Sequence, residues 1–126
     1  MKLRLAANSI RLRLKKLEVE QLACSGRVEE RVSFTGRHDA FHYVIESSCG
    51  VDRVQARFQP NGIVVEVPAA QVAHWATCEQ VGIEGIQVAG DSDKLTILIE
   101  KDFACLNGSE EQNVDTFPNP LAGTKC

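Results

Sequence analysis

The sequence predicts an α+β fold: a mostly antiparallel twisted sheet or half-barrel of about eight strands, with two short helices. Short segments with apolar residues at every second position recur along the 126-residue chain, and this period is typical of strands with one buried face. The turns between these segments are too short for the crossover connections that parallel neighbours need. Helical spacing is confined to two short stretches, so helices can cover only one face or an open end of the sheet.

The N-terminal segment predicts two strands followed by a helix. Residues 2–6 and 10–14 alternate apolar with mostly basic side chains, and Asn8-Ser9 between them is a typical turn sequence. Over residues 15–25 the apolar spacing changes to that of a helical stripe. Gly26 is expected to end this helix, because glycine readily adopts the left-handed conformation of a helix C-terminus.

The middle of the chain predicts four further strands and the second helix. Asn61-Gly62 lies between two alternating segments and is typical of a tight hairpin. Pro68 is expected to begin the second helix, since proline is well placed at a first helical position. Val72 and Trp75 lie on the apolar side of that helix. The four predicted strands are residues 27–35, 40–47, 53–59 and 63–67.

The most apolar segment, residues 94–103, predicts the interior strand around which the sheet is organised. Leu95, Ile97 and Ile99 share one face of this strand, and the Gly-Asp-Ser-Asp sequence before it is typical of a turn. Residues 81–89 are predicted to form the preceding strand. The remaining strands are shorter and more polar, so we expect them to pair beside this one.

Residues 1–106 are interpreted as a single α+β domain, and no internal repeat is apparent in the sequence. Residues 107–126 are interpreted as a polar C-terminal tail, because Asn, Gly, Ser and acidic residues dominate them. Such a segment buries little apolar surface to offset its ordering entropy, so we expect it to be either flexible or docked on the sheet. Phe117 and Pro118 are the expected anchor of a docked tail, since proline holds the chain extended beside the aromatic ring.

Composition limits the classes of function. The net charge is −3, and the chain has a single Trp and a single Tyr, which argues against nucleic acid as a partner. No apolar run is long enough to span a bilayer, and the N-terminal residues lack the apolar core of a signal peptide. We therefore expect a cytoplasmic protein without membrane association, whose partner is a protein or a small-molecule ligand.

The five cysteines predict neither a disulfide framework nor a zinc ribbon, because their number is odd and no Cys-x-x-Cys motif occurs. A weaker zinc hypothesis uses His74 and Cys78, whose i,i+4 spacing on a helix directs two ligands the same way. Cys105 and Cys126 bracket the tail and offer further zinc ligands or a disulfide. The alternative is that these cysteines are free thiols in a reducing compartment. The sequence favours this alternative, and it therefore predicts no cofactor.

Two polar patterns are candidate sites. His38, Asp39 and His42 are interpreted as the polar end of a hairpin, because loops normally carry polar residues. A second group, Arg4, Arg11 and Arg13, is placed by the strand period on one face of a two-strand ribbon.

These three guanidinium groups are suited to bind a phosphate or carboxylate through paired hydrogen bonds. The alternative is a solvated face on which glutamates of other strands pair with the arginines, and the sequence favours this alternative.

Five segments in matching order also carry a family resemblance: residues 8–14, 18–22, 81–85, 100–106 and 117–120. They resemble a family of small bacterial proteins that is classed as a domain of unknown function. Lys15-Lys16-Leu17 stands where that family usually begins its helix with Ser or Thr. The resemblance implies no activity, cofactor or partner, and it directs attention to Cys105 and to the Phe-Pro-Asn-Pro sequence of the tail.

Three hypotheses of function follow. The first is a non-enzymatic cytoplasmic binding or interaction domain, whose surface a docked tail completes. The second is a small metal- or thiol-dependent enzyme that uses Cys105 with a histidine. The third is an anion or phosphate-ligand binder that uses Arg11 and Arg13. The sequence favours the first hypothesis, because no nucleophile motif or phosphate-cradling glycine loop occurs in it.

Overall fold

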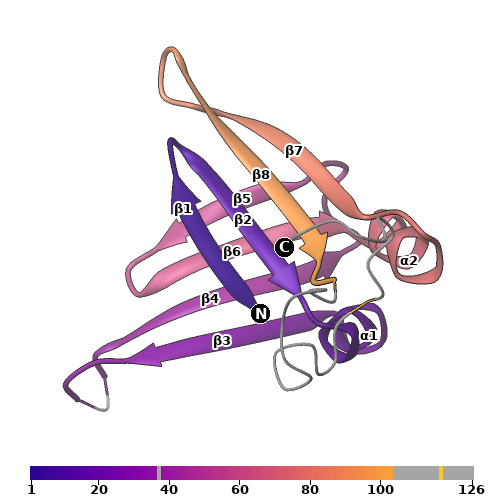
Figure 1. Ribbon diagram of the computed structural model, residues 1–126. Helices are drawn as coiled ribbons and strands as arrows, with labels where there is room; N and C mark the ends of the chain where they lie inside the picture. Colours follow the sequence, from indigo (N-terminus) through magenta and orange to yellow (C-terminus); the bar gives the residue numbers. More distant parts are fainter. Residues whose placement is uncertain (37, 104–116, 118–126) are drawn as a thin grey trace.

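The computed structural model of the chain describes residues 1–36, 38–103 and 117 (Figure 1). Within these residues, eight strands and two short helices follow one another in the order that the sequence predicts. The strands form two four-stranded sheets, here called sheet A and sheet B. The α+β class is therefore confirmed, while the single twisted sheet or half-barrel is replaced by two separate sheets.

The observed elements coincide with the predicted segments, with small shifts at their ends. In chain order they are β1 (Lys2–Ala6), β2 (Ser9–Leu14), α1 (Lys16–Ser25), β3 (Arg27–Ser33), β4 (Ala40–Ser48), β5 (Gln55–Gln59), β6 (Gly62–Pro68), α2 (Ala69–Thr77), β7 (Gly82–Ala89) and β8 (Asp93–Lys101).

Sheet A has the strand order β1-β2-β8-β7, and sheet B has the order β3-β4-β6-β5. The four strand pairs that turns connect, β1–β2, β3–β4, β5–β6 and β7–β8, are antiparallel as predicted. Two further pairs, β2–β8 and β4–β6, are parallel. The sequence does not predict these parallel pairs, because they join distant strands and turn lengths carry no information about such pairing.

β8 lies inside sheet A between β2 and β7, which confirms the interior strand predicted at residues 94–103. Ile97 and Ile99 are fully buried, and Leu95 packs against the same core. Burying one such side chain contributes roughly 1.5–3 kcal/mol relative to leaving it exposed. β8 is therefore a main contributor to the stability of sheet A.

The two sheets face each other and share one core, with both helices at one end (Figure 1). Toward the other end, where the hairpin turns lie, the sheets diverge. The helices contact each other and close the narrow end of this wedge. The fully buried side chains come from both sheets and both helices: Leu12, Leu14, Val19, Leu22, Ile45, Val65, Val67, Val72, Trp75, Ile97 and Ile99.

The ends of α1 follow the capping rules. Gly26 after the helix has a φ of 80°, and its N–H donates to the Leu22 carbonyl at 3.0 Å, which confirms the predicted glycine stop. At the other end the Glu18 carboxylate accepts the Lys15 N–H at 2.9 Å. This carboxylate caps the helix although the chain has no Ser or Thr at the N-cap.

The second helix, α2, begins at Ala69, one residue after the predicted Pro68. Its Trp75 is fully buried and donates its indole N–H to the Val81 carbonyl at 3.1 Å, so this large side chain enters the core with its polar atom satisfied. Within the described residues, neither helix is long enough and apolar enough to cross a membrane.

The β1–β2 turn consists of Ala7 and Asn8 rather than Asn8 and Ser9. Both residues have positive φ, 48° and 56°, as required for the two-residue turns that match the twist of a hairpin. The Asn8 side chain donates to the Lys94 carbonyl at 2.7 Å, which holds the turn against β8. The turn sets Ala6 opposite Ser9, and this register decides which groups of β1 lie at the edge of sheet A.

The two halves of the chain repeat one topology, although no repeat is apparent in the sequence. The halves β1–β2–α1–β3–β4 and β5–β6–α2–β7–β8 have the same order, and each places its two hairpins in different sheets. The registers also agree: Ala6 faces Ser9 across the first turn, and Gln59 faces Gly62 across the equivalent turn. Equivalent core positions are Leu12 with Val65, Leu14 with Val67, Val19 with Val72 and Leu22 with Trp75. The equivalence exchanges sheet A with sheet B.

Candidate functional site

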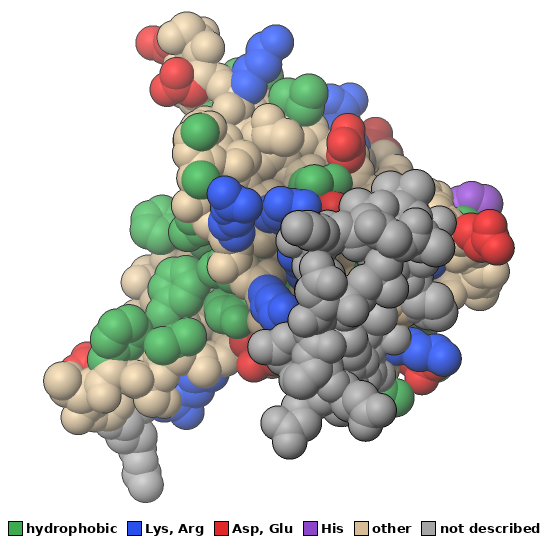
Figure 2. Space-filling model, viewed as in Figure 1, with side chains coloured by type: hydrophobic (Ala, Val, Ile, Leu, Met, Phe, Trp, Pro, Cys, Tyr) green, Lys and Arg blue, Asp and Glu red, His purple; other side chains and the backbone are tan. Residues whose placement is uncertain are grey.

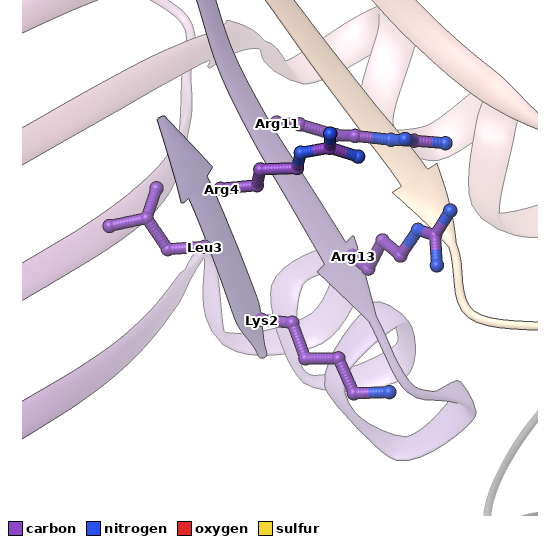
Figure 3. Close-up of a pocket in the computed structure, with 5 residues that line it drawn as sticks. All are labelled: Lys2, Leu3, Arg4, Arg11 and Arg13. Atoms are coloured by element: carbon purple, nitrogen blue, oxygen red, sulfur yellow. The ribbon is translucent and has the colours of Figure 1, made fainter. Parts of the chain in front are cut away.

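The outer face of the β1–β2 hairpin carries four cationic side chains, here called the basic face: Lys2, Arg4, Arg11 and Arg13. Together with Leu3 they line a shallow hollow of about 190 Å³. In Figure 3 the four cationic side chains extend from the two strands toward β8, whereas Leu3 points away from them. The structure thus brings together the three arginines that the sequence predicts on one face, and it adds Lys2.

Two like-charge pairs lie directly across this hairpin. Lys2 faces Arg13, and Arg4 faces Arg11. Like charges directly opposite each other on one sheet face destabilise strand pairing, by roughly 0.2–1 kcal/mol for each pair. The four cations therefore repel one another unless carboxylates or a ligand lie beside them.

Glu100 of β8 lies beside the basic face. It accepts a hydrogen bond from Nε of Arg11, and its Oε1 lies 3.7 Å from Nε of Arg13. The hydrogen bond with Glu100 raises the pKa of Arg11 above its ordinary value, while burial opposes this shift. Cross-strand ion pairing, the alternative use of these arginines, is thus present at Arg11 and weaker at Arg13.

Asp102 supplies the second carboxylate, 3.2 Å from the Lys2 ammonium. Four cations and two carboxylates leave the basic face with a net charge of +2. Arg4 is exposed and forms no ion pair with the residues that the structure describes. It is therefore the cation most available to a ligand.

The equivalent face of sheet B has no such excess of charge. The residues equivalent to Lys2, Arg4, Arg11 and Arg13 are, in that order, Gln55, Arg57, Val64 and Glu66. Arg57 and Glu66 form an ion pair of 2.7 Å there, one cation with one anion. Because the two hairpins share their register, the fold does not require four cations. The basic face is a property of this sequence and not of the architecture.

Of the four predicted zinc ligands, His74 and Cys78 lie in the part of the chain that is described, so the zinc site stays a prediction. α2 ends at Thr77, and Cys78 is extended with φ −125° and ψ −177°, so the helical spacing of His74 and Cys78 is lost. Cys105 and Cys126 lie outside the described residues. Within the described ranges, no three His, Cys, Asp or Glu side chains are grouped as a metal ion would need.

The histidines near the β3–β4 turn have separate contacts. His42 places Nδ1 2.9 Å from a carboxylate oxygen of Glu29, and Asp39 accepts the Thr35 hydroxyl at 2.8 Å. His38 is exposed in the turn. These contacts are those of a polar hairpin end.

Phe117, from the predicted tail, packs against the core. Its N–H donates to the Asp102 carbonyl at 2.8 Å, and its ring lies edge-on to Phe103 with centroids 5.9 Å apart. The Lys101 ammonium lies 5.4 Å from the centroid of the Phe117 ring. Pro118 lies outside the described residues, and the anchoring role of the pair stays a prediction.

Sequence reasoning missed Lys101, and it expected glutamates on other strands to pair with the arginines without singling out Glu100. Lys101 is buried, donates to the Cys78 carbonyl at 2.7 Å and lies 5.8 Å from the Trp75 ring. The strand period could have placed it inside, because Lys101 shares a face with Ile99. No local signal marks Glu100, since its position beside the arginines depends on the parallel pairing of β2 with β8.

A family model described as "Family of unknown function (DUF7009)" matches residues 1–121. No curated protein and no solved structure matches the chain. The family match covers both sheets, both helices and the whole basic face, and it confirms the resemblance carried by the five sequence segments. The chain therefore belongs to DUF7009, a family of unknown function.

Proposed function

We propose that this protein is a binding domain whose basic face holds an oxyanion group, a phosphate or a carboxylate of its ligand. The observation that carries the proposal is the opposition of Lys2 to Arg13 and of Arg4 to Arg11. This arrangement costs stability, and the equivalent hairpin of sheet B folds with the same register without it. Glu100 and Asp102 balance two of the four positive charges, and an anionic ligand offsets the repulsion that remains.

The cations differ in what they offer a ligand. Arg4 is exposed, and its planar guanidinium suits two parallel hydrogen bonds to one oxyanion. Arg11 and Arg13 use Nε toward Glu100, which holds them in position and leaves their terminal nitrogens as donors. Lys2 adds a compact charge at the strand edge.

Binding is the chemistry that this set of groups supports best. Guanidinium and ammonium groups donate hydrogen bonds and carry no acceptor, so they suit an oxyanion better than they suit proton abstraction. The hollow of about 190 Å³ accommodates a phosphate or carboxylate group. The rest of a larger ligand would lie across the outer surface of sheet A.

We further propose that the protein is bacterial and cytoplasmic and that its partner is a protein or a small molecule. A docked tail, anchored by Phe117 and Pro118, completes the surface near the end of β8. The contacts of Phe117 with Lys101 and Asp102 support this docking.

Titration calorimetry with pyrophosphate, a small polyanion, tests the proposal. The unmodified protein should bind it, and the double variant Arg4→Gln with Arg11→Gln should bind at least about tenfold more weakly. Each charged hydrogen bond contributes roughly 1.5–3 kcal/mol, and a tenfold change in Kd corresponds to about 1.4 kcal/mol. Added salt should also weaken the binding, because the interacting charges are near the surface.

Arg57→Gln is the matched control, because Arg57 is the sheet B equivalent of Arg4. This variant should bind pyrophosphate as the unmodified protein does, and circular dichroism should show that all variants are folded. Unchanged affinity in the double variant, or an equal loss in the control, would contradict an anion site on the basic face.

A further inference from the structure

Each sheet has two edge strands. The sheets contact each other along one pair of these edges, and the other pair carries different residues. β5 of sheet B contacts β7 of sheet A. The structural repeat makes β1 and β3 the equivalent pair of edges. The two edges can therefore be compared position by position, and their differences come from side chains.

The β5–β7 edge is closed by a side chain. The amide of Gln87 accepts the Ala56 N–H at 2.7 Å and donates to the Ala56 carbonyl at 3.0 Å. Gly85 on the same strand has no side chain, and a Cβ there would lie 2.8 Å from the Cβ of Val54. Glycine thus lets the backbone of β7 approach the start of β5. Gln87 satisfies the backbone N–H and C=O of Ala56 at the edge of β5.

The β1–β3 edge has different residues at the equivalent positions. Val32 stands where β7 has Gln87, so the edge of β1 receives no amide from this position. Glu30 stands where β7 has Gly85, and its carboxylate lies 3.1 Å from the Met1 nitrogen. Longer side chains therefore span the gap at the start of β1, and the amide contact that closes the other edge is missing.

The backbone of β1 offers hydrogen-bonding groups at this edge. In a hairpin with a two-residue turn, alternate residues bond across the ladder, and the register leaves Leu3 and Leu5 as the non-bonded positions. Ala56 is equivalent to Leu3, and both its backbone groups bond to Gln87, outside the ladder. The N–H and C=O groups of Leu3 and Leu5 thus point away from β2. Within the described ranges, no backbone group pairs with them.

Apolar side chains are exposed on β1 and at the end of β3. Leu5 is 57% exposed, Val32 46% and Phe34 70%. Figure 2 shows hydrophobic side chains gathered on this side of the molecule, between β1 and the β3–β4 hairpin. Lys2 and Arg4 lie on the opposite, outer side of β1. Among the described residues, the edge therefore combines unpaired backbone groups with an apolar inner side and a cationic outer side.

We propose that the edge of β1 binds an extended acidic peptide of a partner protein, which adds a strand to sheet A. Residues of the peptide opposite Leu3 and Leu5 are apolar and enter the gap, and the alternate residues are acidic and lie beside Lys2 and Arg4. Main-chain hydrogen bonds supply affinity in such strand addition, and alternate side chains supply specificity. The inference rests in part on the proposed function, because the peptide carboxylates occupy the basic face.

Charge selects this occupant over a second copy of the chain. Two β1 edges paired with each other would place Lys2 and Arg4 of one copy beside those of the other. Like charges on neighbouring strands oppose pairing, and charged edge residues are a common protection against self-association. The same cations attract an acidic segment.

Fluorescence anisotropy with a labelled Ser-Glu-Val-Glu-Leu-Glu-Ser peptide tests the inference. Leu5→Glu places a carboxylate in the gap, and it should weaken peptide binding at least about tenfold, a change of about 1.4 kcal/mol. Phe58→Glu is the matched control, because Phe58 is the equivalent residue of β5 and is 87% exposed. Its peptide affinity should stay within about twofold of that of the unmodified protein.

Two methylated peptides test for strand addition itself. One carries N-methyl groups on Val and Leu, and the other carries them on the Glu residues. Only alternate amides of an added strand face β1, so one of these peptides should lose binding and the other should keep it. The inference would be overturned if the two methylated peptides bound equally well or equally poorly. It would also be overturned if Leu5→Glu and Phe58→Glu weakened peptide binding equally.

Pyrophosphate titration separates this inference from the proposed function. Leu5→Glu should bind pyrophosphate as the unmodified protein does, because Leu5 does not line the basic face. Pyrophosphate binding without any peptide binding would overturn strand addition and leave the anion site standing. Sedimentation velocity completes the test, since a dimer that Leu5→Glu abolishes would identify a second copy as the occupant and overturn the peptide.

Discussion

Glu100→Gln is expected to change stability and anion binding in opposite directions. The Glu100 side chain is 17% exposed, and that of its partner Arg11 is 32% exposed. A hydrogen bond to a charged group contributes roughly 1.5–3 kcal/mol, and partial exposure to solvent reduces this to about 1 kcal/mol. We therefore expect the free energy of unfolding to fall by about 1 kcal/mol. For a chain of this size that corresponds to a decrease in Tm of roughly 3–5 °C.

The same substitution removes a carboxylate from the basic face and raises its net charge from +2 to +3. One unit charge about 4 Å from an anion contributes about 1 kcal/mol in a watery environment. This corresponds to roughly fivefold tighter binding of pyrophosphate. A purely structural role for the basic face predicts the loss of stability without the gain in affinity.

Urea denaturation and titration calorimetry measure the two effects on one preparation. Glu46→Gln is the control, because Glu46 is the sheet B equivalent of Glu100 and lies 3.7 Å from Arg27. It should lower stability slightly and leave pyrophosphate affinity unchanged. Unchanged affinity in Glu100→Gln would refute the reasoning, and so would an equal gain in both variants.

Two further predictions concern the tail and Tyr43. Phe117→Ala should lower the free energy of unfolding by about 2 kcal/mol, roughly half the usual loss for a fully buried Phe. Phe34→Ala, at a position that is 70% exposed, should change it little, and equal effects in urea denaturation would contradict the anchoring role. Burial, then the charges of Glu30 and Glu18, raise the pKa of Tyr43 above its ordinary value of 10.0. Above that pH the unfolded chain loses this proton first, so stability should fall as pH rises. Because Tyr43 is the single tyrosine, phenolate absorbance should titrate at higher pH in the folded protein than in urea, and equal midpoints would contradict the burial effect.

The candidate site was predictable only in part. Alternation of Arg with Leu in residues 10–14 is a local pattern, and it correctly indicates which arginines share a face. Pairing of the arginines with strand glutamates was predictable, but which glutamate lies beside Arg11 was not, because that depends on the parallel pairing of β2 with β8. At Cys78 a local pattern was misleading. Its spacing from His74 indicates a shared helix face, yet α2 ends at Thr77.

The fold likewise has features that local sequence patterns predict and features that only long-range contacts decide. Apolar period, glycine and turn residues act over a few neighbours, so the sequence by itself determined the order of strands and helices, the four hairpins and the central strand β8. Only the tertiary structure decided that the strands form two sheets and that the halves repeat one topology. It also decided that Gln87 closes the edge of β5, whereas no backbone group of the described residues pairs with the edge of β1. These features depend on contacts between residues far apart in the chain, and such contacts leave no periodic trace in a single sequence.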